Sequence, residues 1–423
     1  MQNTTRNPLS RLDLDDFPAT WSRHDLDRIT DDDLLASASE LLTIPHEESA
    51  DSFTLHAPLE LMARAQLLPS VSPHRRRSAR QRIAQIAATW MSTGTTTGTA
   101  DDAPVGQPIR ALVEALRDGD VETVDRAFVS LCAIRNQEEI VGDLADIVLP
   151  HLGGAAHGSI FLELLPRFRP AGTNGALMGR TLLRDLAEHP ASRLSWFDEP
   201  RTAPLRHGSL TERLLAPRAE RKPASHFVQP TMSLIEDTGL AHRTLADVTH
   251  GMSIERARRE LLAIAAMSML QDDPANAPYG WTHCLTLPQA ALAIADRSTD
   301  PQRAVDIAAT YVLGYRATQS STPIDPNWQP DPPAAADIEA ITALDPSTAA
   351  SAAWHATAEQ RGLIVQQLID HAAPHRDAHL AKYTLACLDA GSNDPTAPHL
   401  YLAAAAYLAA WWRHHDQSEG TTP

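Results

Sequence analysis

Four histidines, spaced roughly a hundred residues apart, are the side chains with the most chemical potential in this chain of 423 residues. His56, His157, His283 and His379 each lie in a segment whose pattern predicts a helix. Imidazole suits iron, zinc, copper and nickel, and ligands on facing helices can build a metal site inside a helical bundle. Because the segments are so far apart in sequence, only folding can bring these four rings together.

Lys382 follows His379 by three residues and is the fifth candidate ligand. The spacing predicts that His375, His379, Lys382 and Ala386 share one face of a helix. An ammonium beside a metal cation is repelled, but a desolvated lysine has a lowered pKa and is more readily neutral. A neutral amine can take up CO2 to form a carbamate, whose anionic oxygens are hard ligands that complement imidazole. The alternative is an ordinary exposed lysine.

Each histidine also has a purely structural interpretation. His157 follows two alanines and precedes Gly158, and a buried histidine bonded to a carbonyl explains it as well as a ligand does. His56 stands two residues before Pro58, near the expected first turn of a helix, where it could simply cap or stack. His283 lies on an otherwise apolar face, where a core histidine is the simpler explanation.

The elements that must position these side chains are predicted to be helices throughout. Apolar residues recur at helical spacing, alanine is abundant, and no alternating β-branched run stands out. We therefore expect an all-α, large multi-helix single domain with a buried central pocket. Pro288 should kink or end the helix that carries His283, and Asp394-Pro395 should start the last helix. The predicted helices are 31–44, 55–67, 76–91, 107–118, 120–134, 136–151, 155–167, 175–189, 252–271, 281–296, 301–318, 347–358, 359–372, 374–390 and 396–412.

The remaining segments define the expected organisation of the chain. Residues 21–416 are predicted to form the helical domain, with a partly flexible segment at 1–20 and a flexible tail at 417–423. The expected loops are 91–106, which is small and polar, 190–230, a proline-rich stretch that could cover a pocket, and 320–335, which is rich in proline and aspartate.

Composition excludes several classes of function. The formal charge of −17 and the absence of a broad basic patch argue against nucleic-acid binding. The three cysteines form no CxxC pair, so no disulfide framework is expected, which fits a reducing cytoplasm. The first twenty residues lack the apolar core of a signal peptide, and the most apolar stretch, Leu400 to Trp412, is too short to span a bilayer. We expect a cytoplasmic protein that contacts neither membrane nor nucleic acid; no pattern indicates its oligomeric state.

Four segments resemble, in order, the motifs of the questin oxidase-like family. They are residues 55–66 (LHAPLELMARAQ), 153–164 (GGAAHGSIFLEL), 282–286 (THCLT) and 377–388 (DAHLAKYTLACL). Each motif is short and degenerate, so their order and spacing carry more weight than any one of them. The resemblance spans most of the chain.

The resemblance implies an all-helical, iron-dependent oxygenase of secondary metabolism. Its expected reaction is oxidative C–C cleavage or Baeyer–Villiger-like oxidation of an aromatic, anthraquinone-type polyketide with O2. The implied cofactor is one non-haem iron held by His56, His157, His283 and His379, with Lys382 as a carboxylated fifth ligand. Five ligands leave one open position, the general logic of non-haem iron oxygenases. NAD(P)H is a further electron source that this chemistry admits.

The chain departs from the family pattern at three places. Gln289 stands where the family often has a second histidine after the third motif, Leu55 replaces an asparagine, and Phe161-Leu162 replaces an arginine. These departures bear on which histidine of the third motif is the ligand and on which substrate fits. Two alternatives remain: a metal-independent NAD(P)H-linked oxidoreductase of the same fold, and a non-enzymatic helical binding protein in which the histidines are structural.

Overall fold

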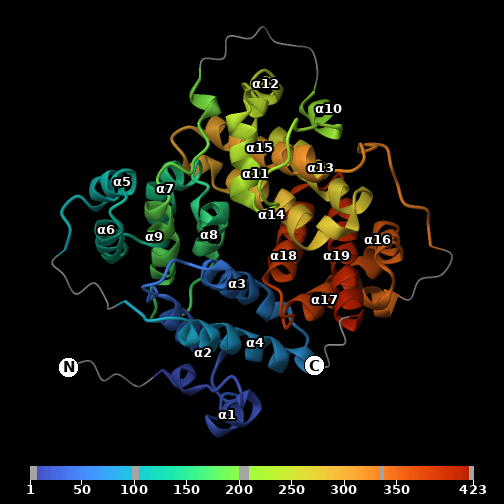
Figure 1. Ribbon diagram of the computed structural model, residues 1–423. Coiled ribbons are helices and arrows are strands. Elements are labelled where there is room, and N and C mark those ends of the chain that lie inside the picture. The colour runs from blue at the N-terminus through green and yellow to red at the C-terminus, as the bar shows by residue number, and fades with distance from the viewer. Residues whose placement is uncertain (1–6, 98–103, 200–208, 334–337, 419–423) are drawn as a thin grey trace.

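The computed structural model describes residues 7–97, 104–199, 209–333 and 338–418, and this part of the chain is all-α, as predicted (Figure 1). These residues form no strand; their β pairing amounts to two isolated bridges, His46 with Thr96 and His151 with Arg193. A single continuous cluster of buried apolar side chains joins the helices. The expected single helical domain is therefore confirmed.

The α-helices are named in chain order. They are α1 (Phe17–Arg23), α2 (Asp31–Leu42), α3 (Ser52–Leu67), α4 (Pro73–Ser92), α5 (Pro108–Asp118), α6 (Val121–Ile134), α7 (Gln137–Val148), α8 (Gly158–Leu164), α9 (Arg180–Glu188), α10 (Leu210–Leu215), α11 (Val228–Asp237), α12 (Leu240–Leu245), α13 (Ile254–Gln271), α14 (Thr282–Ala293), α15 (Pro301–Gln319), α16 (Pro346–Trp354), α17 (Ala358–Ala372), α18 (Ala378–Asn393) and α19 (Pro398–Ser418).

Several helices begin where the sequence supplies a side chain for the first backbone N–H groups, which have no partner within the helix. The Thr30 hydroxyl accepts from Asp33 N at the start of α2. Asn136 and Glu139 cap α7 reciprocally. Such caps fix the helix start to the residue, which matters where a candidate ligand lies in the first turn.

Four helices in the middle of the molecule contact one another in a closed cycle. α3 packs against α8, α8 against α14, α14 against α18, and α18 back against α3. In Figure 1 these helices surround the centre of the molecule, with α13 and α15 beyond α14, and α19 beyond α18. Each of the four helices contains or directly follows one of the four candidate histidines.

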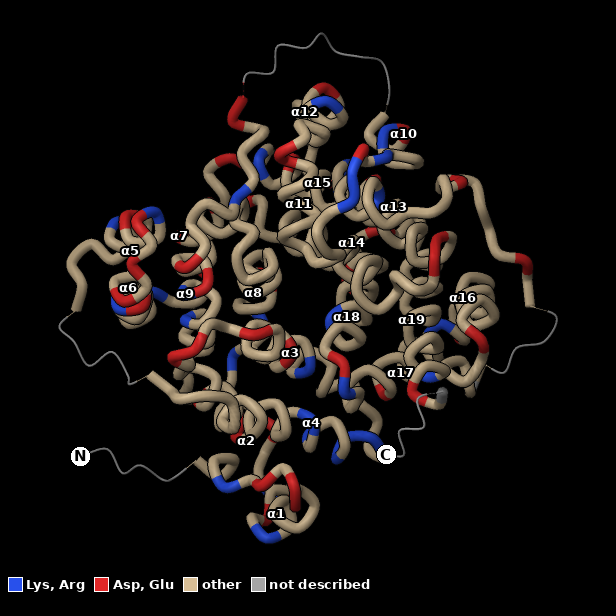
Figure 2. Tube along the Cα trace, viewed as in Figure 1, with Lys and Arg blue, Asp and Glu red and all other residues tan. Residues whose placement is uncertain are grey.

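The most apolar stretch of the sequence is an internal helix. Residues 400–410 of α19 are all buried, and α19 packs against α13, α16 and α18. Figure 2 shows the same contrast along the chain: α5 and α6 carry many charged residues, whereas α14 and α15 carry few. A helix that is apolar all round is a buried helix. Within the described ranges, no helix combines the length and the apolarity needed to cross a membrane.

The helix predictions hold for the long elements and fail for several short ones. Segment 190–230 was expected to be a loop, but α10 lies within it, α11 begins at Val228, and 200–208 lie outside the described residues. α1 and α12 were not predicted either. These elements have six to ten residues, too few turns for an apolar period to stand out.

Two prolines, Pro58 and Pro288, lie inside helices. α14 runs through Pro288 to Ala293, so of the two expected outcomes, a kink or an end, the helix does not end at Pro288. Pro58 likewise lies inside α3, which places His56 in the second turn of the helix and not the first. Both prolines are buried in the packed core, where tertiary contacts outweigh the roughly 3 kcal/mol cost of an interior proline.

The ends of the domain also differ in detail from the prediction. α18 begins at Ala378 instead of 374, and the last helix begins at Pro398 instead of 396. Within the predicted segment 1–20, residues 8–11 form a short 3-10 helix and α1 begins at Phe17; 1–6 lie outside the described residues. Of the predicted tail, 417 and 418 belong to α19, and 419–423 are also not described.

Candidate metal centre

The four histidine rings meet in the same cyclic order as the helices that carry them. Ring centroids are 4.5 Å apart for His56 and His157, 5.5 Å for His157 and His283, 4.9 Å for His283 and His379, and 4.9 Å for His379 and His56. His56, His157 and His283 are buried, and the His379 side chain is 14% exposed. Folding thus brings together side chains separated by as many as 323 residues, the difference between 379 and 56.

Three of the rings are held through Nδ1, which leaves Nε2 for the centre of the cluster. His283 Nδ1 lies 2.8 Å from the Tyr279 carbonyl oxygen, and His379 Nδ1 lies 3.3 Å from Asp377 Oδ1. Both oxygens can only accept, so each Nδ1 carries the proton and each Nε2 presents a lone pair. His56 Nδ1 pairs with Ser52 Oγ at 3.2 Å. This is how metal-ligating histidines are normally oriented.

The inward nitrogens are close enough to share one cation. One nitrogen from each of His56, His283 and His379 lies within 4.8 Å of the others. His157 joins through its Nε2, 3.3 Å from Nε2 of His283. Two nitrogens at that distance attract each other only when one carries a proton or a cation lies between them. Nitrogens around a metal with bonds of roughly 2.0–2.1 Å are separated by roughly 3.0–3.4 Å, so the separation between His157 and His283 is that of two ligands of one transition-metal ion.

His157 is positioned by a left-handed turn that the sequence analysis missed. The φ values of Gly154, Ala155 and Ala156 are 59°, 51° and 58°. His157 comes next and is the residue immediately before α8. Asp185 on α9 accepts a short hydrogen bond from Gly154 N. An L-residue in this conformation costs roughly 1–2 kcal/mol. Strain of this kind tends to be kept where a side chain must be aimed.

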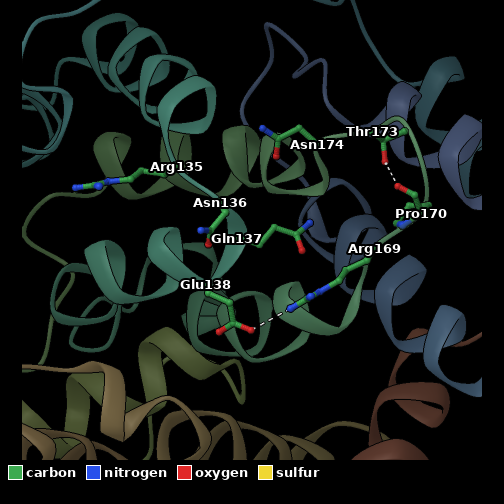
Figure 3. Close-up of a pocket in the computed structure, with 8 residues that line it drawn as sticks. All are labelled: Arg135, Asn136, Gln137, Glu138, Arg169, Pro170, Thr173 and Asn174. Atoms are coloured by element: carbon green, nitrogen blue, oxygen red, sulfur yellow. Dashed lines mark hydrogen bonds and ion pairs between the residues drawn. The ribbon is translucent and has the colours of Figure 1, made fainter.

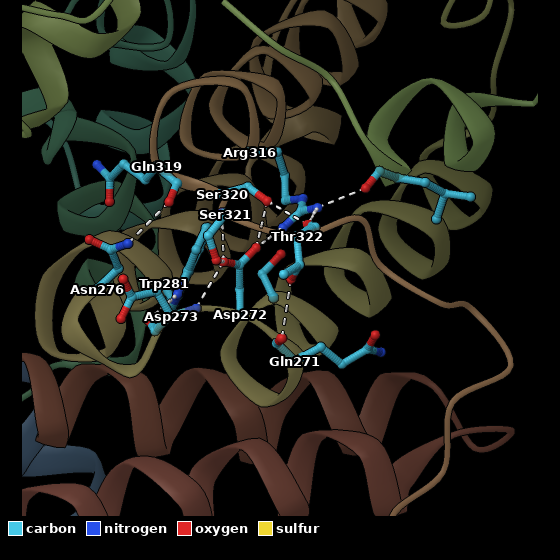
Figure 4. Close-up of polar contacts among 12 residues, drawn as sticks. Gln271, Asp272, Asp273, Asn276, Trp281, Arg316, Gln319, Ser320, Ser321 and Thr322 are labelled. Atoms are coloured by element: carbon cyan, nitrogen blue, oxygen red, sulfur yellow. Dashed lines mark hydrogen bonds and ion pairs between the residues drawn. The ribbon is translucent and has the colours of Figure 1, made fainter.

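His283 is positioned by a π-helical turn, Ala277–Trp281, that runs directly into α14. Trp281 Nε1 donates to Asp273 O at 3.1 Å, and the Arg316 guanidinium lies 5.9 Å from the Trp281 ring centroid. Figure 4 shows the polar cluster around this turn. In it, fully buried Arg316 pairs with Asp272 at 2.6 Å, and Asp272 also accepts from Ser320 Oγ and Ser321 N.

The helices of His56 and His379 are tied together by a buried arginine. Arg64 on α3 donates to the carbonyls of Ala372 and His375, in the turn that leads to α18. Glu60 holds Arg64 through Nε at 2.8 Å and also binds Arg82. The Glu60 carboxylate is thus engaged by two arginines and not by a histidine of the cluster.

His375 does not share the face of His379 as expected. It precedes the Asp377 cap of α18 and is therefore outside that helix. Its Nε2 lies 3.1 Å from Asp416 Oδ2, and its ring packs against Trp412. The prediction failed because Asp377 starts the helix by accepting from His379 N at 2.7 Å, a cap that the helical pattern alone does not reveal.

The electrostatics of the cluster favour neutral donors. Burial lowers the pKa of His56, His157 and His283 well below the ordinary value, and neighbouring Lys382 and His379 lower it further. Burial and then Lys382 also lower the pKa of His379, against the opposing effect of Asp377. Neutral imidazoles are the metal-binding form.

Lys382 lies close enough to the cluster to influence the pKa of all four histidines. Its side chain is 5% exposed, and Nζ has no hydrogen-bond partner among the described residues. Burial lowers its pKa to about 8, with Asp377 and Glu60 opposing that shift. The alternative of an ordinary exposed lysine is wrong.

A narrow cavity of about 10 Å³ adjoins Lys382, lined also by Glu163, Thr286 and Gln289. That volume holds about one water molecule. Burial raises the pKa of Glu163 to about 7, and its carboxylate faces Arg167 at 3.4 Å. Gln289 thus lies beside Lys382, while His283 is the residue of its helix that joins the ring cluster.

Two tyrosine rings are in contact with the cluster. Tyr279 lies 4.3 Å from His283 and 5.5 Å from His379 between ring centroids, and Tyr315 stacks on His283 at 6.3 Å. Tyr279 precedes His283 by four residues, a helical spacing that could have indicated it.

A surface cleft of about 640 Å³ takes no part in the cluster. Figure 3 shows it between the start of α7 and residues 169–174, with Arg169 bonded to Glu138 at 3.1 Å. None of its lining side chains has a buried polar atom without a partner. Its geometry is that of a solvated surface groove.

Comparison of the chain with protein-family models, with curated proteins and with solved structures finds no match.

Proposed function

We propose that His56, His157, His283 and His379, together with a carboxylated Lys382, hold one non-haem iron, and that the protein is an iron-dependent oxygenase. The observation that carries this proposal is the arrangement of the rings: Nδ1 atoms of three of them are bonded to Ser52, Tyr279 and Asp377, and one nitrogen from each of these three histidines lies within 4.8 Å of the others. A structural histidine needs one hydrogen-bond partner. Four that point one nitrogen at a common centre are better explained as ligands.

Lys382 supports the proposal through its environment. A buried Nζ without a partner is costly when charged, and a lowered pKa makes the neutral amine accessible near pH 7. The neutral nitrogen would attack CO2 to form an N–C bond and release one proton, which leaves an anionic carbamate. That anion would balance the charge of a cation among four neutral imidazoles.

Iron, when bound, would supply the one-electron redox chemistry through which O2 reacts with a closed-shell organic substrate. The chain's own part is to hold the donors rigidly and to present the substrate. Tyr279 lies against two of the histidines, and Phe227, which is 60% exposed, meets Tyr279 edge-on at 5.3 Å. We propose that an aromatic polyketide-type ring approaches along this pair and undergoes C–C cleavage or Baeyer–Villiger-like oxidation.

Oxygen uptake by iron-loaded protein with a panel of hydroxylated anthraquinones tests this function. We expect uptake that depends on both substrate and iron, and that stops when iron is removed with a chelator. Turnover that persists after chelation and requires NAD(P)H would favour the metal-independent oxidoreductase. Substrate binding without any turnover, with or without NAD(P)H, would favour the binding protein.

A further inference from the structure

A surface pocket of about 550 Å³ lies away from the five residues of the centre, between the end of α5, the end of α7 and the loop before residue 194. A pocket of this size suits a small organic ligand. Two loops form one wall, and a pair of backbone hydrogen bonds fixes them: Leu152 N donates to Ser192 O, and Leu194 N donates to Pro150 O, each at 2.8 Å. The pocket is therefore rigid on this side.

The lining combines an apolar wall with a basic rim. Apolar contacts come from Val113, Leu116, Ile147, Pro150 and Pro190, and Val113 is 47% exposed. The basic groups are Arg117, Arg193 and Arg303. Three guanidiniums around one pocket offer N–H donors to an anion, in a chain with a formal charge of −17.

The ion pairs of the three arginines leave some nitrogens at the pocket free to bind a ligand. Arg117 pairs with Asp118 at 3.0 Å, and Arg193 and Arg303 share a single carboxylate, that of Asp198, at 3.6 Å and 2.9 Å. Arg303 Nε and His151 Nδ1 are buried nitrogens with no partner among the described residues. Buried polar atoms without partners are rare in native proteins and call for a ligand, a water or a functional reason. The cleft in Figure 3 has no such atoms along its wall.

Asp146, the one carboxylate of the lining, adds a third negative charge to those of Asp118 and Asp198 and so offsets the three arginines. It is already engaged by Ser298 Oγ, Thr299 N and Thr299 Oγ1. Its negative charge remains beside the pocket and repels a dianion such as phosphate more strongly than a monoanion. Guanidiniums bind carboxylates through paired hydrogen bonds.

From this combination of apolar wall, basic rim and unpartnered buried nitrogens, we infer that the pocket binds a small monocarboxylate with an apolar ring or chain. The apolar part would lie on Val113 and Ile147, and the carboxylate would face the arginines. This inference does not depend on the proposed metal or on the oxygenase reaction, because no residue of the pocket belongs to the histidine cluster.

Three probes test separately whether the pocket requires the carboxylate and whether it requires the apolar body. Their binding to the full-length protein is measured by calorimetry. 2-Naphthoate has both the charge and the apolar body, 2-naphthalenemethanol has the body alone, and inorganic phosphate has charge alone. We expect saturable one-to-one binding of 2-naphthoate, at least tenfold weaker binding of the alcohol, and no competition by equimolar phosphate. Equal affinity for naphthoate and the alcohol, or naphthoate binding that is absent at millimolar concentration, would overturn the inference.

Arg117→Ala should weaken naphthoate binding by roughly tenfold, the loss expected for a hydrogen bond to a charged group. Arg117 is 72% exposed, so the variant should fold. Arg110→Ala is the matched control, since Arg110 lies on the same helix with similar exposure, paired with Glu114 outside the pocket. Equal losses in the two variants would indicate a general charge effect and would contradict the site. Val113→Asp tests the apolar wall and should weaken binding at least as strongly.

Discussion

Asp377 holds both the ring and the backbone of His379. Its Oδ1 atom lies 3.3 Å from His379 Nδ1 and accepts from His379 N at 2.7 Å. Burial acts to raise the pKa of Asp377, but the hydrogen bonds and charge of His379 outweigh burial and keep that pKa well below its usual range. The carboxylate therefore fixes which nitrogen of the ring carries the proton.

Asp377→Ala should weaken metal binding by about 10–100-fold, the usual effect of removing an acceptor behind a ligating histidine. The variant also loses a helix cap, which costs about 0.5–2 kcal/mol of stability. Asp345→Ala is the control, because Asp345 caps α16 in the same way without touching a histidine. Metal titrations of both variants separate the two effects; equal metal affinity in the two would exclude the proposed role of Asp377.

Lys382→Met should raise the free energy of unfolding of the metal-free protein and should weaken its binding of iron. Methionine fills a similar volume without a buried amine that lacks a partner, so we expect a gain of about 1–3 kcal/mol in the free energy of unfolding. Iron content should fall, because the carbamate is lost. Lys382→Arg should not restore it, since guanidinium stays charged. Lys222→Met, at an exposed lysine, should change neither quantity; unaltered iron content in Lys382→Met would remove lysine from the ligand set.

Ala155→Gly should stabilise the protein by up to about 1 kcal/mol. Ala155 has φ 51°, a conformation that costs an L-residue roughly 1–2 kcal/mol and glycine very little. Ala145→Gly, in the regular helix α7, should have the opposite sign by about 0.5–1 kcal/mol. Urea unfolding measures both. A loss of stability in Ala155→Gly would show that the left-handed turn before His157 is not strained.

Arg316→Met should destabilise the protein by about 3–5 kcal/mol, because it leaves the buried Asp272 carboxylate without its cation. The double variant Arg316→Met, Asp272→Leu should recover part of the loss, since both charges are then gone. Thermal unfolding of the two single variants and the double variant gives the coupling free energy between Arg316 and Asp272. Strictly additive losses would mean that the pair in Figure 4 contributes nothing as a pair.

The metal-free protein should lose stability as the pH falls below about 6.5. Burial lowers the pKa of His371 to about 3, so the unfolded chain takes up a proton before the folded one does. The contribution of His371 is fully present above its unfolded pKa of about 6.5 and is lost progressively as the pH falls toward 3. We expect His371→Leu to reduce the loss between pH 7 and pH 5 by on the order of 1–2 kcal/mol. An unchanged pH profile in that variant would contradict this.

Much of the fold follows from local pattern, and much of the site does not. Long helices such as α13 and α15 repeat an apolar period over five turns, so the sequence predicts them. The left-handed turn at Ala155 and the partnership of Asp185 with Gly154 depend on contacts between α9 and the turn, which no local pattern encodes. The candidate ligands came from motif order, whereas Ser52 and Tyr279 could have been found from their i, i+4 spacing to His56 and His283.

The metal content of the purified protein tests the central claim most directly. After expression with added iron, elemental analysis should find about one iron per chain, and His157→Ala and His379→Ala should each lose most of it while remaining folded by circular dichroism. His151→Ala, a histidine outside the cluster, should keep the full content. The account is contradicted if the unaltered protein binds no transition metal, or if both cluster variants retain full occupancy.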